Sequence, residues 1–386
     1  MKFRLLLLLS LLSFSVVHAD IIYVNANAAA GGDGTSWETA YNDLQDALAV
    51  TVSGRGDQVW IAQGTYYPID ITNQAEFDRT ATFYIKDQVA LYGGFIGTET
   101  DLAQRDWESY PTILSGEIWQ DQIYWSIHVT TIDNNTVTFD GITITKGNAN
   151  GSGNNTDRAA AVYGGGNVTA TNCTFSENSA NNGGVAYDGT WTATNCTFSG
   201  NSANRGGVAR SGIWKTLNNI FHNNSGNGQF YWSTIYATNE TTPSPFIVFA
   251  NNLISGGDAA FVNCTFPVPI PDENLIDTDP LFVNIADPDG PDDIWGTEDD
   301  GLRLQSSSPA IGLGDASFLP LDTYDLDGDD DAAESLPVDI AGYKRIQDTT
   351  LDLGAYEYGN VIGLSTVFTT TAGAATGGSV SPSGAI

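Results

Sequence analysis

The stretch that decides the fold is Asn172-Cys173-Thr174-Phe175-Ser176-Glu177-Asn178-Ser179-Ala180, which returns further along the chain as Asn195-Cys196-Thr197-Phe198-Ser199-Gly200-Asn201-Ser202-Ala203. Gly183-Gly184-Val185-Ala186 recurs at the same offset as Gly206-Gly207-Val208-Ala209, and a weaker third copy keeps the register at Asn218-Asn219-Ile220-Phe221. A fixed period of about 20 to 50 residues is typical of solenoids. Short β-runs separated by Gly and Asn predict an all-β, right-handed parallel β-helix with ~23 residues per coil.

The repeat also predicts which side chains stack from coil to coil. Strand alternation turns Cys196 and Phe198 inward and Thr197 outward. Asparagine tolerates the left-handed conformation, so it suits a corner between strands. We therefore expect a corner ladder of asparagines and an internal ladder of cysteines and phenylalanines, made of Asn172, Asn195 and Asn218, Cys173 and Cys196, and Phe175, Phe198 and Phe221.

Only three cysteines occur in the chain, at Cys173, Cys196 and Cys264. An odd number of widely spaced cysteines does not describe a disulfide framework. We interpret the stacked pair Cys173 and Cys196 as small apolar core residues.

The chain divides into four predicted parts. Residues 1–19 read as a cleavable signal peptide, with a basic start, an apolar run from Leu5 to Val17 and small residues at the cleavage site. Residues 20–286 hold the coils, roughly ten at this period, preceded by a short amphipathic capping helix within 39–49. Residues 287–359 form an Asp-rich acidic segment, and residues 360–386 form an uncharged Ser/Thr/Gly tail that reads as a linker or the start of a truncated module.

The charge of the chain limits its partners. Lys+Arg number 14 against 46 Asp+Glu, a net of −32; without residues 1–19, which carry Lys2 and Arg4, the balance is 12 against 46, or −34. Such a charge repels nucleic acid and anionic membranes. The apolar run of the signal peptide is too short for a spanning helix, so we expect no transmembrane span after cleavage. We also expect a monomer.

Two acidic turns predict structural Ca²⁺, because oxygen ligands at alternating positions around a glycine are what this ion requires. The first would use Asp325, Asp327, Asp329, Asp331 and Glu334, and the second Asp287, Asp289 and Asp292. The first turn is not an EF-hand, because Leu336 occupies the position of the bidentate glutamate. Solvated acidic loops are the alternative for both turns.

Trp191 and Trp214 lie one period apart and would stack as one ladder. Facing outward, the pair could bind sugar rings of an extracellular glycan; facing inward, it would be an aromatic part of the core. No acidic or basic ladder keeps register through the central coils, so the sequence predicts no catalytic residues.

The residues also resemble known bacterial families. Ile22-Tyr23-Val24, Leu91-Tyr92-Gly93-Gly94-Phe95 and Phe139-Asp140-Gly141-Ile142-Thr143 resemble secreted right-handed parallel β-helix repeat proteins. The Asn-Cys-Thr-Phe units resemble the repeats of polymorphic outer membrane proteins. Gly296-Thr297-Glu298-Asp299-Asp300-Gly301-Leu302 through Leu353-Gly354-Ala355-Tyr356-Glu357 is similar to the choice-of-anchor Q domain. The resemblance implies export and display at the cell surface, associated with the outer membrane.

Together these features predict a secreted or cell-surface, adhesin-like β-helix scaffold without catalytic activity, stabilised by calcium. Its partners would be extracellular glycans or the surface of a host or neighbouring cell. The alternative is an extracellular polysaccharide-binding protein, or a polysaccharide lyase or glycoside hydrolase acting on acidic or plant or algal glycans.

Overall fold

The computed structural model describes most of the chain between residues 18 and 359. The described ranges are 18–69, 78–107, 110–118, 125–153, 155–227, 230–231, 246–255, 261–262, 273–293, 295, 297–322, 334–340, 344–347 and 349–359. Residues 1–17 of the predicted signal peptide and the predicted tail at 360–386 lie outside these ranges.

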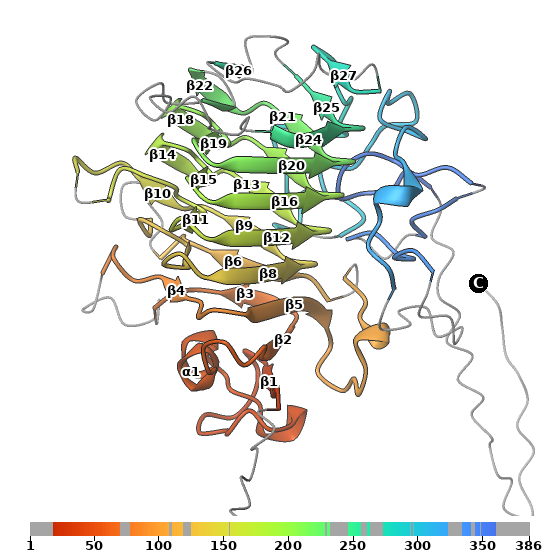
Figure 1. The fold of residues 1–386 in the computed structure, drawn as a ribbon. Helices are drawn as coiled ribbons and strands as arrows, with labels where there is room; N and C mark the ends of the chain where they lie inside the picture. Colours follow the sequence, from red (N-terminus) through yellow and green to blue (C-terminus); the bar gives the residue numbers. More distant parts are fainter. Residues whose placement is uncertain are drawn as a thin grey trace, which may run out of the picture.

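Short strands stack in parallel along one axis and form four sheets in the described residues (Figure 1). Sheet A contains, in spatial order, β1 (Ile21–Val24), β2 (Gln58–Ala62), β5 (Val89–Phe95), β8 (Thr136–Asp140), β12 (Asn167–Thr171), β16 (Thr190–Thr194), β20 (Ile213–Leu217) and β24 (Phe246–Ala250). Sheet B contains β3 (Gly64–Tyr66), β6 (Thr112–Ser115), β9 (Thr143–Thr145), β13 (Thr174–Ser176), β17 (Thr197–Ser199), β21 (Ile220–His222), β25 (Leu253–Ile254) and β27 (Leu275–Ile276).

Two smaller sheets complete the coils. Sheet C contains β4 (Phe83–Tyr84), β7 (Thr130–Thr131), β11 (Val162–Tyr163), β15 (Ala186–Tyr187), β19 (Ala209–Arg210), β23 (Phe230–Tyr231) and β26 (Phe261–Val262). Sheet D contains β10 (Asn148–Ala149), β14 (Ser179–Asn182), β18 (Ser202–Arg205) and β22 (Ser225–Asn227). Consecutive coils pair in parallel in every sheet, which confirms the predicted parallel β-helix.

The period of the repeat holds only in the central coils. Asn167 pairs with Thr190 and Thr190 with Ile213, so each of these two steps equals the offset between Asn172 and Asn195. Gln58 pairs with Ala90 instead, which is a longer step. The longer coils carry extra residues in the connections between strands, which lengthen the coil without changing the pairing of its strands.

A short helix covers the first coils, later in the chain than the sequence predicted. The helix α1 (Leu44–Val50) begins after Asp43, whose side chain accepts a hydrogen bond from the Gln45 amide at 2.8 Å. The residues before it form a 3₁₀ turn, η1 (Trp37–Thr39), and a bridge between Tyr41 and Val24. Leu44 and Leu48 of α1 are buried in the hydrophobic core. Figure 1 shows α1 at the N-terminal end of the coils, beside β1 and β2.

The phenylalanine ladder is confirmed. Phe175 and Phe198 stack at 4.9 Å between ring centroids, and Phe198 and Phe221 at 4.7 Å. Cys173 and Cys196 are free and buried in the same core. Each ring therefore rests on the equivalent ring of the next coil, as the repeat predicted.

Trp191 and Trp214 form a second internal ladder, so the prediction that they bind sugar rings is wrong. Each side chain is only 1 % exposed, and the two rings stack at 4.9 Å. Alternation within β16 explains the result, because Trp191 shares its face with the buried Ala193.

The corner asparagines have the predicted left-handed backbone conformation, but their side-chain amides do not form the predicted continuous ladder. Asn172, Asn195 and Asn218 all have positive φ angles, between 50° and 56°. Among them the amide of Asn218 reaches Asn195 at 3.4 Å. The Asn172 amide instead donates to the carbonyl of Val338, which lies far along the chain.

Continuous amide ladders form at other asparagines of the repeat. Asn178 donates to Asn201 at 3.1 Å, and Asn201 to Asn224 at 2.9 Å. A similar ladder runs through Asn219 and Asn252. These ladders satisfy buried amide groups from coil to coil, which an apolar core requires.

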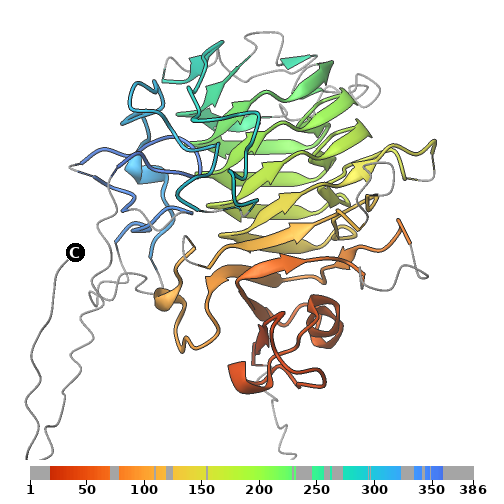
Figure 2. The same cartoon turned by 180° about the vertical axis from the view of Figure 1, so that it is seen from behind.

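The C-terminal segment, defined here as residues 277–359, covers the outer face of sheet B (Figures 1 and 2). It includes the 3₁₀ turn η7 (Ala316–Phe318), whereas η3 (Leu102–Gln104) belongs to an early loop. Outward-facing residues of sheet B are buried beneath it, including Thr197 at 1 % exposure and Ile220 at 1 %. Ile220 shares a hydrophobic cluster with Leu353 and Tyr356 of the segment. The predicted acidic segment is thus packed on the coils.

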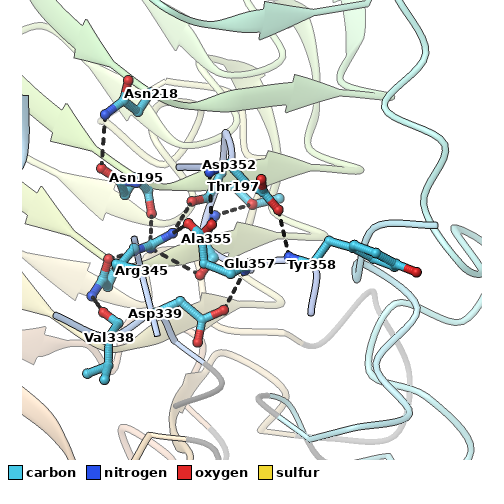
Figure 3. Close-up of polar contacts among 12 residues, drawn as sticks. Asn195, Thr197, Asn218, Val338, Asp339, Arg345, Asp352, Ala355, Glu357 and Tyr358 are labelled. Carbon is cyan, nitrogen blue, oxygen red and sulfur yellow. Dashed lines mark hydrogen bonds and ion pairs between the residues drawn. The ribbon is translucent and has the colours of Figure 1, made fainter. Parts of the chain in front are cut away.

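A buried ion pair connects this segment to the corner asparagines, Asn172, Asn195 and Asn218 (Figure 3). Arg345, fully buried, donates to Glu357 at 2.7 Å and to the side-chain oxygen of Asn172 at 2.5 Å. The Ala355 amide donates to the Thr197 hydroxyl at 3.0 Å. Burial raises the pKa of Glu357 well above its usual value, although Arg345 opposes that shift. Removing one partner would leave the other charge buried alone.

We expect Phe198→Ala to lower the free energy of unfolding by about 3–5 kcal/mol, because it leaves a cavity between two stacked rings. Urea denaturation measures the loss. Tyr84→Ala is the control, since Tyr84 is 44 % exposed on sheet C. A loss at Phe198 no larger than that at Tyr84 would contradict the ladder.

We expect Arg345→Met to cost about 3–5 kcal/mol, because it leaves Glu357 buried without its cation. Its neighbour Lys344 is exposed, so Lys344→Ala removes a charge without breaking the pair. Thermal unfolding of both variants checks the prediction, and equal stability of the two would show that the ion pair contributes nothing.

Candidate metal centre

Of the two predicted calcium turns, only the second lies wholly within the described residues. Asp325, Asp327, Asp329 and Asp331 lie outside the described residues, whereas Glu334 lies just inside them. The backbone carbonyl of Glu334 accepts a hydrogen bond from the Asp322 amide at 2.8 Å. Calcium at the first turn therefore stays a prediction.

The second turn brings three carboxylates together. Side-chain oxygens of Asp287, Asp289 and Asp293 all lie within 4.8 Å of one another. Backbone hydrogen bonds shape the turn: the Gly290 amide donates to the Asp287 carbonyl at 3.3 Å, and the Asp293 amide to the Gly290 carbonyl at 3.1 Å. Gly290 has a φ of 70°, and a Cβ there would lie 2.5 Å from the Asp299 carbonyl oxygen. Glycine is therefore required at this position.

The sequence predicted Asp292 as the third carboxylate of this turn, whereas the carboxylate that lies within 4.8 Å of those of Asp287 and Asp289 is that of Asp293. The prediction assumed that ligands alternate along the chain, as in an extended loop. The backbone instead turns continuously from Pro288 to Asp293, so a residue four positions after Asp289 returns to the same side. The hydrogen bonds of these consecutive turns bring Asp293 back beside Asp289, and the alternating pattern of the sequence does not indicate them.

The cluster opens into a cavity of about 380 Å³ between the C-terminal segment and the edge of sheet B. The cavity is lined by Thr65, Tyr67, Ile113, Ser115, Glu117, Thr145, Lys146, Asp289, Asp293 and Trp295. Asp289, Asp293 and Trp295 come from the segment, and the remaining residues from the coils. A ligand bound here would contact both parts of the molecule.

One buried hydroxyl in this cavity has no hydrogen-bond partner among the described residues. Thr145 is 1 % exposed, and its Oγ1 atom is neither hydrogen-bonded nor accessible to solvent. It lines the same cavity as Asp289 and Asp293. A buried polar atom left unpaired carries a free-energy cost.

The carboxylates of this region outnumber the nearby cation. Lys146 forms an ion pair with Glu117 at 2.6 Å, and Glu177 and Asp289 lie in its electrostatic range. Burial raises the pKa of Asp289, and the charges of Asp293 and Asp287 raise it further. Burial also raises the pKa of Glu177. Unneutralised negative charge therefore remains in the cavity.

In the cation-free cavity, the pKa of Lys146 is raised, which opposes a role as general base at neutral pH. Burial lowers its pKa, but the hydrogen bond to Glu117 and the surrounding carboxylates outweigh burial and raise it overall. A lysine that abstracts protons needs a pKa tuned downward, towards neutrality.

The similarities to known proteins do not assign this cavity to a family. No family model matches the chain, and no curated protein matches it. Among solved structures, the crystal structure of pectate lyase Pel9A is similar at 13 % sequence identity, covering 89 % of this chain and 97 % of that one, with a TM-score of 0.32. Within the described residues, no helix has the length and apolar character to cross a membrane.

The raised pKa values give a pH-dependent prediction for the cation-free protein. Because the folded pKa values of Asp289 and Glu177 lie above their ordinary values, the folded chain holds these protons more tightly than the unfolded chain. The associated stability is present at low pH and is lost as pH rises through the folded pKa values. In chelator, the melting temperature should therefore fall as the pH rises above the ordinary carboxylate range, about pH 4.

Asp289→Asn mimics the protonated side chain, so in chelator at neutral pH it should melt above the wild type and show a shallower fall with pH. Asp292→Asn removes the same charge from the same turn and serves as the control. Differential scanning calorimetry over this pH range measures both. If the melting temperature of Asp289→Asn fell with pH as steeply as that of the wild type, the charge of Asp289 would not destabilise the cation-free protein.

Proposed function

We propose that this chain is an exported, extracellular β-helix scaffold whose C-terminal segment is held on the coils by a divalent cation. The observation that carries the proposal is the grouping of Asp287, Asp289 and Asp293 beside the unpaired Thr145 hydroxyl. The aspartates belong to the segment and the threonine to sheet B. A cation between them would join the two parts.

The chemistry of the cluster favours Ca²⁺. All candidate ligands are oxygens, and the group contains neither histidine nor cysteine, on which zinc and other softer metals depend. Ca²⁺ accepts six to eight oxygen ligands in flexible geometry, so water can complete the shell in a partly open cavity. Extracellular calcium modules bind in the range of about 10⁻⁴–10⁻³ M, which suits a partly exposed site with three carboxylates.

Export is supported by the sequence. The basic start and apolar run at residues 2–17 are typical of a signal peptide. The charge of −32 suits a soluble protein outside the cell. The resemblance to secreted β-helix repeats and to the choice-of-anchor Q domain points in the same direction and suggests display at a cell surface.

The competing proposal is a polysaccharide lyase, which the alternative interpretation of the sequence includes. Such an enzyme would need a neutral base near its cation. Lys146 is a nearby basic group, and its pKa is raised in the cation-free protein, which opposes that role there. Release of unsaturated uronate products from polyuronates, lost in Lys146→Ala, would favour the lyase over the scaffold.

We expect added Ca²⁺ to raise the melting temperature and excess chelator to reverse the rise. At a free concentration of 100 times Kd, binding to the folded state alone contributes about 2.7 kcal/mol. Asp289→Asn should abolish most of this gain, whereas Asp292→Asn should retain it. The two variants carry the same charge, so a difference between them reports on ligands rather than on net charge.

Calorimetric titration of the chelator-treated protein with Ca²⁺ gives the stoichiometry independently. No heat of binding and no change in melting temperature at millimolar Ca²⁺ would remove the cation from the proposal. Equal loss of the gain in both variants would mean that Ca²⁺ acts only by screening the acidic surface.

A further inference from the structure

A second cavity lies on the outer face of sheet C, away from the strands that the C-terminal segment covers. Its volume is about 350 Å³. The side chains around it come from adjacent coils and include Asp133, Asn134, Arg158, Tyr163, Tyr187 and Asp188. Gly164, Gly165 and Gly189 complete the lining without side chains of their own.

The coil register builds this cavity. Val162 pairs with Ala186, which places the outward-facing Tyr163 and Tyr187 on neighbouring strands β11 and β15. Tyr187 in turn pairs with Arg210 of β19. Successive strands lie about 4.8 Å apart, so the three side chains form an outward column with the spacing of the coils.

The column is held in place by packed rings and guanidinium groups. Arg158 lies over the Tyr187 ring at 4.5 Å from its centroid, and Arg210 at 5.4 Å. Tyr163 stacks on His128 at 4.2 Å between ring centroids. These contacts restrict the rotamers of the lining side chains, so a ligand would meet a preformed surface.

Arg158 is loosely paired beside the cavity. Its Nε atom faces a carboxylate oxygen of Asp157 at 3.6 Å, an ion pair longer than a hydrogen bond. The Arg158 side chain is still 40 % exposed, so its guanidinium group can donate to a ligand beside the two tyrosines.

The charges of this site are mixed and almost balanced. The lining holds Arg158 with Asp133 and Asp188, which leaves one net negative charge. An anionic ligand would meet two carboxylates, and a small cation would meet a guanidinium group. A neutral ligand rich in hydroxyl groups satisfies both, because each hydroxyl can donate to a carboxylate and accept from an arginine.

We propose that this cavity binds a residue of an uncharged glycan, held by hydrogen bonds to Arg158 and Asp188 and by contact with Tyr163 and Tyr187. The column continues from Tyr187 to Arg210 along the coil axis, so neighbouring sugar residues would lie on that side of the cavity, away from Tyr84. Glycan binding here uses a different sheet from the cation cluster and does not depend on it.

The test is calorimetric titration with hexasaccharides of uncharged plant polymers, namely glucan, mannan and xylan, beside a hexamer of galacturonate. We expect at least one neutral hexasaccharide to bind, with affinity unchanged in chelator. Tyr187→Ala and Asp188→Asn should each weaken binding by at least about tenfold, or 1.4 kcal/mol. Tyr84→Ala is the matched control, because Tyr84 lies in the same outward column but outside the cavity.

Three results would overturn the proposal. One is the absence of binding by every neutral hexasaccharide at millimolar concentration. Another is preferential binding of the galacturonate hexamer, which would show that an anion is the ligand. The last is equal affinity in Tyr187→Ala, Asp188→Asn and Tyr84→Ala. Circular dichroism and melting temperature establish that each variant is folded, and Tyr187→Phe provides a milder substitution if Tyr187→Ala is not.

Discussion

Each coil of this molecule can bury its apolar edge only against the coils before and after it, so the in-register stacking of coils is the constraint on which the structure depends. That register stacks side chains of the same type: Phe198 packs between Phe175 and Phe221, and Trp191 packs on Trp214. It also aligns the polar groups, because Asn201 bonds the asparagines of both neighbouring coils. A change in one coil is therefore felt mainly by two others.

The same register produces an outer face on sheet B whose side chains the coils alone leave uncovered. Sheet B presents threonine hydroxyls and isolated apolar side chains such as Ile220, and the C-terminal segment covers them. Arg345 and Glu357 anchor the segment at the asparagine corner. The acidic turn at Asp287–Asp293 lies beside sheet B, where its negative charge is only partly offset by Lys146. The proposed cation would balance the remaining charge.

Much of the fold was predictable, because the offset between the repeat copies at Asn172 and Asn195 gives the length of a coil. Alternation along each strand then indicates which side chains face inward and which face outward. The docking of the C-terminal segment was not predictable, since Arg345 meets Asn172 across 173 residues of sequence and no local pattern links them. Trp191 could have been placed from its alternation with Thr190 and Thr192. Asp293 could not, because its role depends on how tightly the backbone turns after Asp289.

The central claim is that a cation joins the acidic turn of the C-terminal segment to sheet B. The most direct measurement is an anomalous difference map from a crystal soaked with a lanthanide that replaces Ca²⁺. The account predicts a peak among the carboxylates of Asp287, Asp289 and Asp293, on the side that faces Thr145. A map with lanthanide peaks elsewhere and none at this cluster would contradict it.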